Sequence, residues 1–401
     1  MAVTLSYKNQ PLPNYLANNP IVFELKSTIQ EIIKFDVTIS GSVVYTGAFI
    51  PAGTAPNYEV NISISEIAKS YLKESSISST SLLVSAVTNS ILPISVKFTQ
   101  NDSVLYYSGN IYKGGIGKKM LRYLKQQNTD IFAYKFLNAD KQFLMTTRTS
   151  GRHIVIKENE LCPLYFFATD HEYSIVTEHL NTFTFPAMTA GNLYALNIEF
   201  LRQSSNNTYG KIPSYLAVLV DGKFVFDITI KEPVKSPNKY IIEFQNSFSS
   251  PERLEVTGKC MAEPEFDNDE GFRTYDSIID DYIEQNDRIG LREIINAEFG
   301  YKTLEEFLFM RDMLQSNKRY LIDQFGNRSE VRVSAENFSH NIYPTEPGSV
   351  SLKIRMTDND ANYSPGVDES EPDFYFGEAI WLRGWTNSIG LLLSDSWLNT
   401  V

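Results

Sequence analysis

The sequence contains few of the residues that usually build a covalent framework or a metal site. Among 401 residues there are 2 cysteines and 4 histidines. Two cysteines are too few for a disulfide framework in a chain of this length. Because Cys162 and Cys260 both lie in strand-like segments, we expect two buried thiols, with a bridge between them as the alternative. The histidines show no close ligand spacing.

Long apolar runs and an excess of basic charge are also lacking. No stretch approaches the ~18 apolar residues that span a bilayer, so we expect no membrane insertion. The first ten residues, MAVTLSYKNQ, lack a cationic segment followed by an apolar run, which predicts no secretory signal and synthesis in the cytoplasm. The formal net charge of −12 weighs against nucleic-acid binding, because affinity for phosphate comes mainly from clustered Lys and Arg.

Catalytic motifs are missing as well. The glycine-rich loop at residues 114–119 has Tyr112 where a nucleotide-binding P-loop needs glycine, and Lys119 where it needs Ser or Thr. The sequence has no Gly-x-Ser-x-Gly elbow, and neither cysteine lies near a histidine along the chain. We therefore predict a protein that is not an enzyme and that uses no cofactor, apart from the calcium considered below.

Material for β-sheets is abundant. Hydrophobic residues make up 42% of the chain and aromatic residues 13%. Apolar and polar residues alternate in residues 35–39 and 94–98, which is the pattern of half-buried strands. Gly41-Ser42 predicts a two-residue hairpin turn of type II′, and Asp221-Gly222 predicts a second tight turn.

These patterns predict a mainly β fold with serial antiparallel β-sandwich (Ig-like) domains, a smaller α+β C-terminal domain and an extended tail. The predicted parts are a first sandwich at 1–115, a basic linker with a short helix at 116–150, a second sandwich at 151–262, an α+β domain with an acidic entry segment at 263–356, and a C-terminal tail or arm at 357–401. Residues 239–260 read as a strand pair that closes the second sandwich, with Phe244 and Leu254 in the core.

Helices are predicted at four places. Ser63 and Glu66 have capping-box spacing, as have Thr303 and Glu306 before the apolar residues of 304–315. Residues 118–125 form a basic stretch with helical potential, and the spacing of apolar residues predicts a helix over 277–285. Segment 291–299 is ambiguous between helix and strand.

Two segments of opposite charge are candidate interaction surfaces. The basic one contains Lys118, Lys119, Arg122 and Lys125 without an intervening acid, and either faces an acidic partner or is a solvated helix face. The acidic one, residues 263–287, has ten carboxylates against Arg273. We expect a solvated face that complements the basic segment within or between subunits. A carboxylate-dependent glycosidase is the alternative, although nothing in the sequence distinguishes an acid from a base.

The C-terminal residues contain two further candidates. Asp358, Asp360, Asn362 and Glu369 have the spacing of a calcium loop, but Tyr363 stands where such a loop needs glycine, so an acidic surface loop is the alternative.

The tryptophans are the second candidate. Trp381, Trp385 and Trp397 are all three tryptophans of the chain. Aromatic rings anchor protein interfaces and also stack on sugars, which makes an interface the first interpretation and glycan binding the second.

Three segments carry a family resemblance: DIFAYKFLNADKQFLMTTRTSGRHIVIKENELCPLYFF (130–167), IIEFQNSFSSPERLEVTG (241–258) and LEEFLFMRDMLQSNKRYLIDQFGNRSEVRV (304–333). In this order they resemble tail or baseplate-type structural proteins from phages and prophages of Bacteroidetes. The resemblance spans roughly residues 20–356 and excludes the acidic insertion and the tryptophan-bearing tail.

What the resemblance implies is a non-enzymatic virion component built of β-sandwiches. Such a protein would form a homo-oligomeric ring, bridge other tail or baseplate proteins, and be located in the virion tail after synthesis in the host cytoplasm. A surface glycan-binding or adhesion module that uses the C-terminal aromatic residues is the alternative function.

Overall fold

A computed structural model describes residues 4–149, 151–235, 240–266, 272–285, 291–300, 302–322, 328–335, 338 and 349–357. The chain divides into two compact units. The first unit comprises residues 1–155, 162–230 and 246–250, and the second comprises residues 156–161, 231–245 and 251–401. Neither unit is a continuous piece of the chain, so no single cut separates them.

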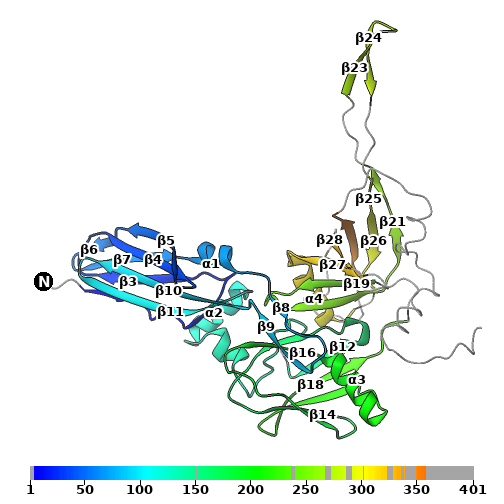
Figure 1. Ribbon diagram of the computed structural model, residues 1–401, viewed down its shortest axis with the longest axis horizontal. Helices are drawn as coiled ribbons and strands as arrows, with labels where there is room; N and C mark the ends of the chain where they lie inside the picture. The colour runs from blue at the N-terminus through cyan, green and yellow to red at the C-terminus, as the bar shows by residue number, and fades with distance from the viewer. Residues whose placement is uncertain are drawn as a thin grey trace, which may run out of the picture. The chain divides into compact units, whose positions relative to one another are not determined.

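The first unit begins with a mainly antiparallel β-sandwich (Figure 1). One sheet has the order β1 (Leu5–Tyr7), β3 (Val22–Ser27), β7 (Asn57–Ser63) and β6 (Ala52–Thr54), and the other has the order β2 (Asn14–Leu16), β11 (Ser103–Tyr112), β10 (Ile91–Gln100), β4 (Ile33–Ile39) and β5 (Ser42–Phe49). Phe23 of one sheet and Phe98 of the other meet at 5.3 Å between ring centroids. The predicted alternation is confirmed, because Phe35, Val37 and Ile39 are buried in this core.

Two local predictions in this sandwich are wrong. The β4–β5 turn is formed by Ser40-Gly41, and φ is positive at both residues (51° and 81°), which is the type I′ geometry that matches strand twist. The capping box at Ser63 is absent, because Ser63 still pairs in β7 and helix α1 (Ser65–Tyr71) begins after Ile64. The Ser65 hydroxyl instead accepts a hydrogen bond from the Ile21 amide at 2.8 Å.

A second sandwich completes the first unit. Its first sheet has the order β12 (His153–Lys157), β18 (Lys223–Lys231), β17 (Tyr215–Val220), β14 (Tyr173–Thr177) and β15 (Thr182–Thr184). Its second sheet has the order β13 (Leu164–Phe167), β16 (Leu193–Leu196), β9 (Val84–Thr88) and β8 (Ser76–Ile77). Phe143 lies between the sheets, 5.7 Å from the ring of Phe166 and 5.2 Å from that of Phe226. Strands β8 and β9 come from within the predicted first domain, so the structure does not divide at residue 115.

The segment 116–150 is not a linker between domains. After helix α2 (Lys118–Gln126) the chain forms a π-helical turn, Phe132–Phe136. Phe132 and Phe136 are buried, and their rings pack on Phe167 of strand β13 at 5.5 and 5.8 Å. Phe132 and Phe136 therefore belong to the core of the first unit, whereas exposed basic side chains lie on α2 and at Lys141. Helix α3 (Ile198–Tyr209) follows β16 in this unit.

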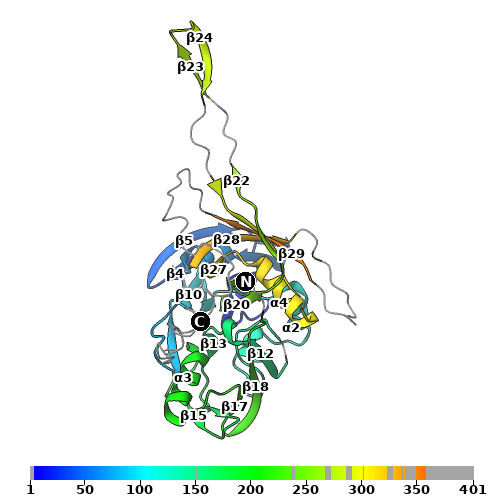
Figure 2. The same cartoon turned by 90° about the vertical axis from the view of Figure 1, so that its right-hand side faces the viewer.

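The second unit is built on one seven-stranded antiparallel sheet. Its order is β20 (Pro251–Val256), β19 (Tyr240–Gln245), β27 (Arg319–Ile322), β28 (Arg328–Ala335), β29 (Ser351–Met356), β26 (Ile294–Glu298) and β21 (Cys260–Ala262). Helix α4 (Leu304–Gln315) lies beside β28 in Figure 2, and Phe309 of the helix packs on Phe244 at 5.2 Å. The predicted capping box of Thr303 and Glu306 is confirmed. Segment 291–299, left open above, forms strand β26 and the short β25 (Leu291–Arg292).

The strand pair in residues 239–260 exists, but its predicted partner is wrong. Strand β19 pairs with β20 on one side and with β27 on the other, so the pair belongs to the α+β sheet of the second unit. Phe244 and Leu254 are each 1% exposed, which confirms both as core residues. Alternation indicated the pair correctly but carried no information about which sheet it joins.

The predicted helix over 277–285 is wrong. Strand β23 (Phe272–Asp276) pairs antiparallel with β24 (Asp281–Gln285), and β22 (Glu265–Phe266) pairs with β25. Thr274, Tyr275, Tyr282 and Ile283 favour strands, and their pairing across the hairpin overrides the helical spacing of the isoleucines. The prediction of a mainly β chain with serial β-sandwiches and an α+β part is confirmed.

Candidate interaction surfaces

The basic face of α2 consists of Lys118, Lys119, Arg122 and Lys125, all exposed. Leu124 is buried on the opposite side of the helix and holds α2 on the core of the first unit. Helix α2 contains no acidic residue, so no charge within the helix balances the basic face. Lys118 and Lys119 stand in the first turn, where the helix dipole disfavours cations, and an anion placed there would be stabilised by both the dipole and the side chains.

Aromatic side chains adjoin this basic face. Tyr123 of α2 is 43% exposed, and its ring lies edge-on to Tyr134 at 5.9 Å. The Lys141 ammonium lies 3.8 Å from the centroid of the Tyr134 ring, which adds another cation to the same region. The surface therefore combines positive charge with an accessible tyrosine ring, and aromatic residues and Arg, unlike Lys, are enriched at protein interfaces.

The hairpin β23–β24 ends in an apolar and acidic turn, residues 276–281, which we call the acidic tip. Ile278 is 91% exposed and Ile279 is 56% exposed. Among the described strands, β23 and β24 pair only with each other. A two-stranded hairpin is marginally stable in water by itself, and large exposed apolar groups of this kind typically mark contact sites.

The carboxylates of the acidic tip are close together. Asp276 and Asp281 are directly opposite in the strand register, and like charges in this position destabilise a hairpin. The Tyr275 hydroxyl donates a hydrogen bond to Asp280, which raises the pKa of Tyr275. The Asp276 carboxylate accepts a hydrogen bond from the Ile278 amide at 2.8 Å, which stabilises the turn. A cationic partner would relieve the repulsion that these contacts leave in place.

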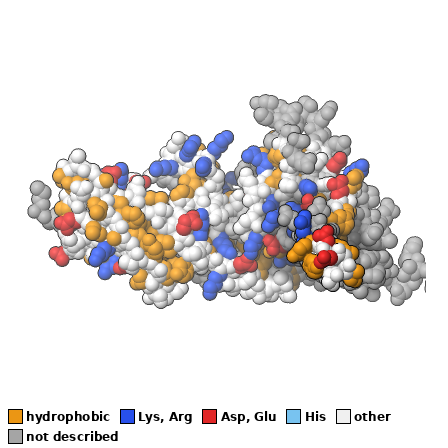
Figure 3. Space-filling model, turned by 90° about the horizontal axis from the view of Figure 1, so that it is seen from above, with side chains coloured by type: hydrophobic (Ala, Val, Ile, Leu, Met, Phe, Trp, Pro, Cys, Tyr) orange, Lys and Arg blue, Asp and Glu red, His pale blue; other side chains and the backbone are white. Residues whose placement is uncertain are grey.

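Strand β5 is a second exposed apolar element, and the sequence reasoning did not identify it as a site. It has eight residues, SVVYTGAF, without a charge, and among the described strands it pairs only with β4. The other terminal strands of the two sandwiches have two to five residues, and residues 103–109 of β11 also pair on one side only among the described strands. Val43 and Tyr45 are about half exposed, and the face in Figure 3 shows broad hydrophobic areas over the first sandwich. A long, uncharged edge is a template for another strand.

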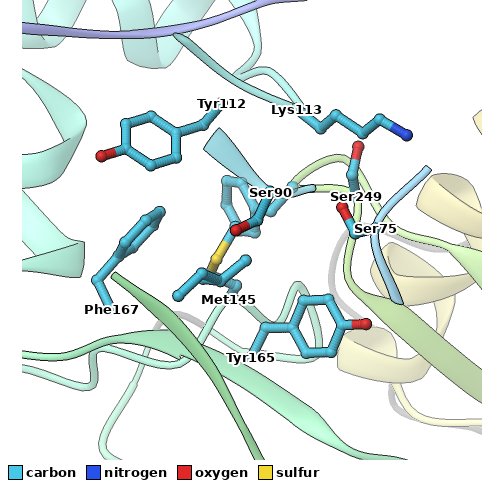
Figure 4. A pocket seen from close by; sticks show the side chains of 10 residues that line it. Ser75, Ser90, Tyr112, Lys113, Met145, Tyr165, Phe167 and Ser249 are labelled. Carbon is cyan, nitrogen blue, oxygen red and sulfur yellow. The ribbon is translucent and has the colours of Figure 1, made fainter. Parts of the chain in front are cut away.

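A small hollow of about 240 Å³ lies within the first unit (Figure 4). Its lining includes the hydroxyl groups of Ser75, Ser90 and Ser249 and the side chain of Lys113, whose pKa is lowered by burial. The remaining lining is largely aromatic. Because the volume of about 240 Å³ includes space open to solvent and the centre of a water molecule has only about 10 Å³ available, the hollow fits a water molecule or a small ion but no organic ligand.

The second unit contains a buried ionic cluster. Lys157 Nζ lies 3.4 Å from Glu306 and 3.7 Å from Glu255, and the Glu160 carboxylate accepts the Glu255 amide at 2.9 Å. Burial and the nearby charge of Lys157 lower the pKa of Lys302 to about 8. A lysine of this kind resembles an activated amine, but Lys302 is 3% exposed, which denies a substrate access to it. We interpret the cluster as the structural connection between residues 156–161, β20 and α4.

Several predicted site residues lie outside the described residues. These are the calcium-loop candidates Asp358, Asp360, Asn362 and Glu369 and the tryptophans Trp381, Trp385 and Trp397. The described ranges contain no cluster of His, Cys, Asp and Glu that could hold a metal ion, and none of their helices is long and apolar enough to cross a membrane. Cys162 is buried and Cys260 is partly buried, and no disulfide joins them, so two thiols rather than a bridge are confirmed, although Cys260 is less buried than predicted.

Comparisons with known proteins give only distant similarities. No protein-family model and no curated relative matches the chain. Similar solved structures include the I9–I11 tandem from titin (7% identity, 57% of this chain and 65% of that chain covered, TM-score 0.16) and the titin I67–I69 fragment (9%, 74% and 94%, TM-score 0.18). A third is the glucan-locus protein SGBP-B of Bacteroides ovatus in complex with a mixed-linkage heptasaccharide (11%, 65% and 63%, TM-score 0.15).

These alignments do not span whole proteins. The chain spans 65% of the I9–I11 tandem and 51% of a four-domain Sidekick-1 immunoglobulin fragment, to which it is 11% identical with a TM-score of 0.18. At such TM-scores, the description of the fold rests on the strand pairing and core contacts of this chain itself.

Proposed function

We propose that the chain is a binding protein without enzymatic activity, and more specifically a structural component of a phage or phage-like tail or baseplate. In this role it assembles with copies of itself and joins other proteins of the particle. The resemblance of residues 130–167, 241–258 and 304–333 to tail proteins motivates the specific part. The observation that carries the proposal is the free edge of β5.

The β5 edge suits pairing with a second copy of itself. Two antiparallel β5 strands would extend the five-stranded sheet into a ten-stranded one through backbone hydrogen bonds. Because β5 carries no charge, the two-fold arrangement brings no like charges together. Phe35 stacks on Phe49 and contacts Tyr45 at 5.7 Å, so the strand is already ordered before a partner arrives.

The test is the mass of the purified chain in solution, measured by analytical ultracentrifugation. We expect the wild type to self-associate. The dissociation constant of the variant Val43→Lys/Ala48→Lys should be at least tenfold higher, because lysine at an edge strand opposes strand addition. The matched control, Ser95→Lys/Thr99→Lys, adds the same charge to at least partly exposed positions of β10, which pair with β11 on one side and with β4 on the other.

Two outcomes would contradict the proposal. A strictly monomeric wild type would exclude self-assembly, and equal dissociation of both lysine variants would show that charge rather than the β5 edge controls association. The tail assignment has its own test: an epitope-tagged chain should sediment with particles when the phage or prophage that encodes it is induced, and its absence from particles would refute that assignment.

A further inference from the structure

We propose that the acidic tip of one copy docks on the basic face of α2 of a second copy. This inference rests on the proposed self-assembly but uses a contact independent of β5. The two surfaces belong to different units of the chain, the tip sequence contains no cation, and the helix contains no acid.

Charge complementarity selects the partner. The acidic tip contains Asp276, Asp280 and Asp281, while the basic face contains four cations and no acid. Opposed carboxylates in an antiparallel pair have Cβ atoms about 5 Å apart, and residues four apart on a helix, such as Lys118 and Arg122, are separated by about 6 Å along the axis. The two patterns of charge therefore have similar spacing.

Apolar contact adds to the attraction. Exposed ion pairs contribute little by themselves, so a stable contact also has to cover apolar surface. Ile278 and Ile279 provide such surface on the tip, and the 43% exposed ring of Tyr123 provides it on the helix. The same contact would relieve two unfavourable features of the monomer. These are the repulsion between Asp276 and Asp281 and the placement of Lys118 and Lys119 in the first turn of the helix.

The same features argue against other classes of partner. A tip with three carboxylates is repelled by anionic lipid surfaces and by nucleic acid, although its isoleucines alone would suit a membrane. A protein surface with cations around an apolar or aromatic centre fits both properties. The chain, with a net charge of −12, carries such a surface on α2.

The contact joins two different surfaces, so it is head-to-tail. Repetition of a head-to-tail contact produces a closed ring or an open chain of copies. Since a β5–β5 contact is two-fold, the two contacts give different stoichiometries and can be separated experimentally. Increasing salt should weaken the tip–α2 contact, because its charges lie at the surface.

The experiment uses charge reversal in the full chain that also carries Val43→Lys/Ala48→Lys, so that β5 does not contribute. The tip variant is Asp280→Lys/Asp281→Lys, and the helix variant is Lys119→Glu/Arg122→Glu. Either variant alone should raise the dissociation constant of self-association at least tenfold, as measured by analytical ultracentrifugation. A helix-control variant, Lys211→Glu/Lys223→Glu, makes the same change in net charge at exposed lysines elsewhere and should leave association unchanged.

Mixing supplies the decisive measurement. In a mixture of the two variants, the lysine-bearing tip of one variant faces the glutamate-bearing helix of the other, and the aspartate tip of the second faces the basic helix of the first. Association should therefore return, in complexes that contain the two variants in equal amounts. A contact within one copy could not be rescued in this way. The inference is overturned if the mixture stays dissociated, or if the helix variant associates like its parent, which would indicate a different protein as the partner of the tip.

Discussion

Two hairpins of this chain both turn at aspartate residues but lie in opposite environments. Strands β17 and β18 turn at Asp221-Gly222, and their apolar residues Val218, Phe226 and Ile228 are each at most 1% exposed. Strands β23 and β24 turn through the acidic tip, where Ile278 is 91% exposed. One hairpin lies inside a five-stranded sheet, and the other forms a sheet of its own.

The difference indicates what each hairpin is for. In β17–β18 the alternation of apolar and polar residues places one face in the core, so the apolar side chains stabilise the fold. In β23–β24 two of the three isoleucines, Ile278 and Ile279, are at the turn, where they stand exposed. Apolar residues that do not stabilise the monomer are available for an intermolecular contact.

The largest effect is expected in the buried hairpin. Phe226→Ala removes a ring that is fully buried and lies 5.2 Å from Phe143. We expect the free energy of unfolding to fall by about 3–5 kcal/mol, because the variant loses apolar burial and leaves a cavity. Urea denaturation followed by fluorescence measures this loss. A change below about 1 kcal/mol would mean that Phe226 of this hairpin is not packed in the core of the sandwich.

A buried charge in the second unit gives a second contrast with the exposed tip. Burial lowers the pKa of Lys302 to about 8, below its unfolded value near 10.4. Between these two pH values the unfolded chain binds more protons than the folded chain, so this lysine makes stability rise with pH. Well below pH 8 Lys302 is charged in both states, and the cost of burying its charge lowers the free energy of unfolding in full.

Lys302→Met removes this penalty and keeps a flexible apolar side chain. The stability of the variant relative to wild type should therefore be greatest at pH 7 and decline by on the order of 2 kcal/mol as the pH rises from 8 to 10.5. Denaturation curves of both proteins over this range provide the measurement. A pH-independent difference would show that Lys302 has the same pKa in the folded and unfolded chains, so that its burial does not lower the pKa.

The sequence predicted much of the buried architecture. Alternation located the hairpin at 221–222 and the strand pair with Phe244 and Leu254, since both patterns follow directly from one-sided burial. Thr303 and Glu306 marked the start of α4 because a capping box is local in sequence. Sheet membership was not predictable, because β9 and β16 pair across more than 100 residues and nothing local encodes such a partner.

The candidate surfaces were predictable in part. Four cations without an acid identified α2, and helical periodicity placed them on a helix. The β5 edge was missed because an uncharged strand has the same alternation whether it is central or at an edge. The acidic tip was predicted as a helix because three isoleucines at helical spacing outweighed the strand preference of the tyrosines that pair across it.

A smaller effect is expected at the turn of the buried hairpin. Gly222 has φ of +73°, and no atom lies within 4 Å of the place that a Cβ would take, so Gly222→Ala introduces backbone strain without a clash. We expect a loss of about 1 kcal/mol in thermal denaturation. Gly151→Ala is the matched control, because Gly151 is outside the left-handed region and its added methyl group meets only an ordinary contact; equal losses in both variants would refute the strain.

The smallest effect on stability, and the largest on association, is expected at the acidic tip. Ile278→Ser/Ile279→Ser removes the exposed aliphatic groups without altering charge. Because neither side chain is buried in the monomer, the free energy of unfolding should change by less than about 0.5 kcal/mol. Self-association in the Val43→Lys/Ala48→Lys chain should weaken at least tenfold, since the apolar part of the tip–α2 contact is lost. Leu180→Ser, at an 83% exposed position, is the matched control for a general loss of surface hydrophobicity. If the tip variant unfolds more readily instead, its isoleucines belong to the core of the chain and the contrast between the two hairpins fails.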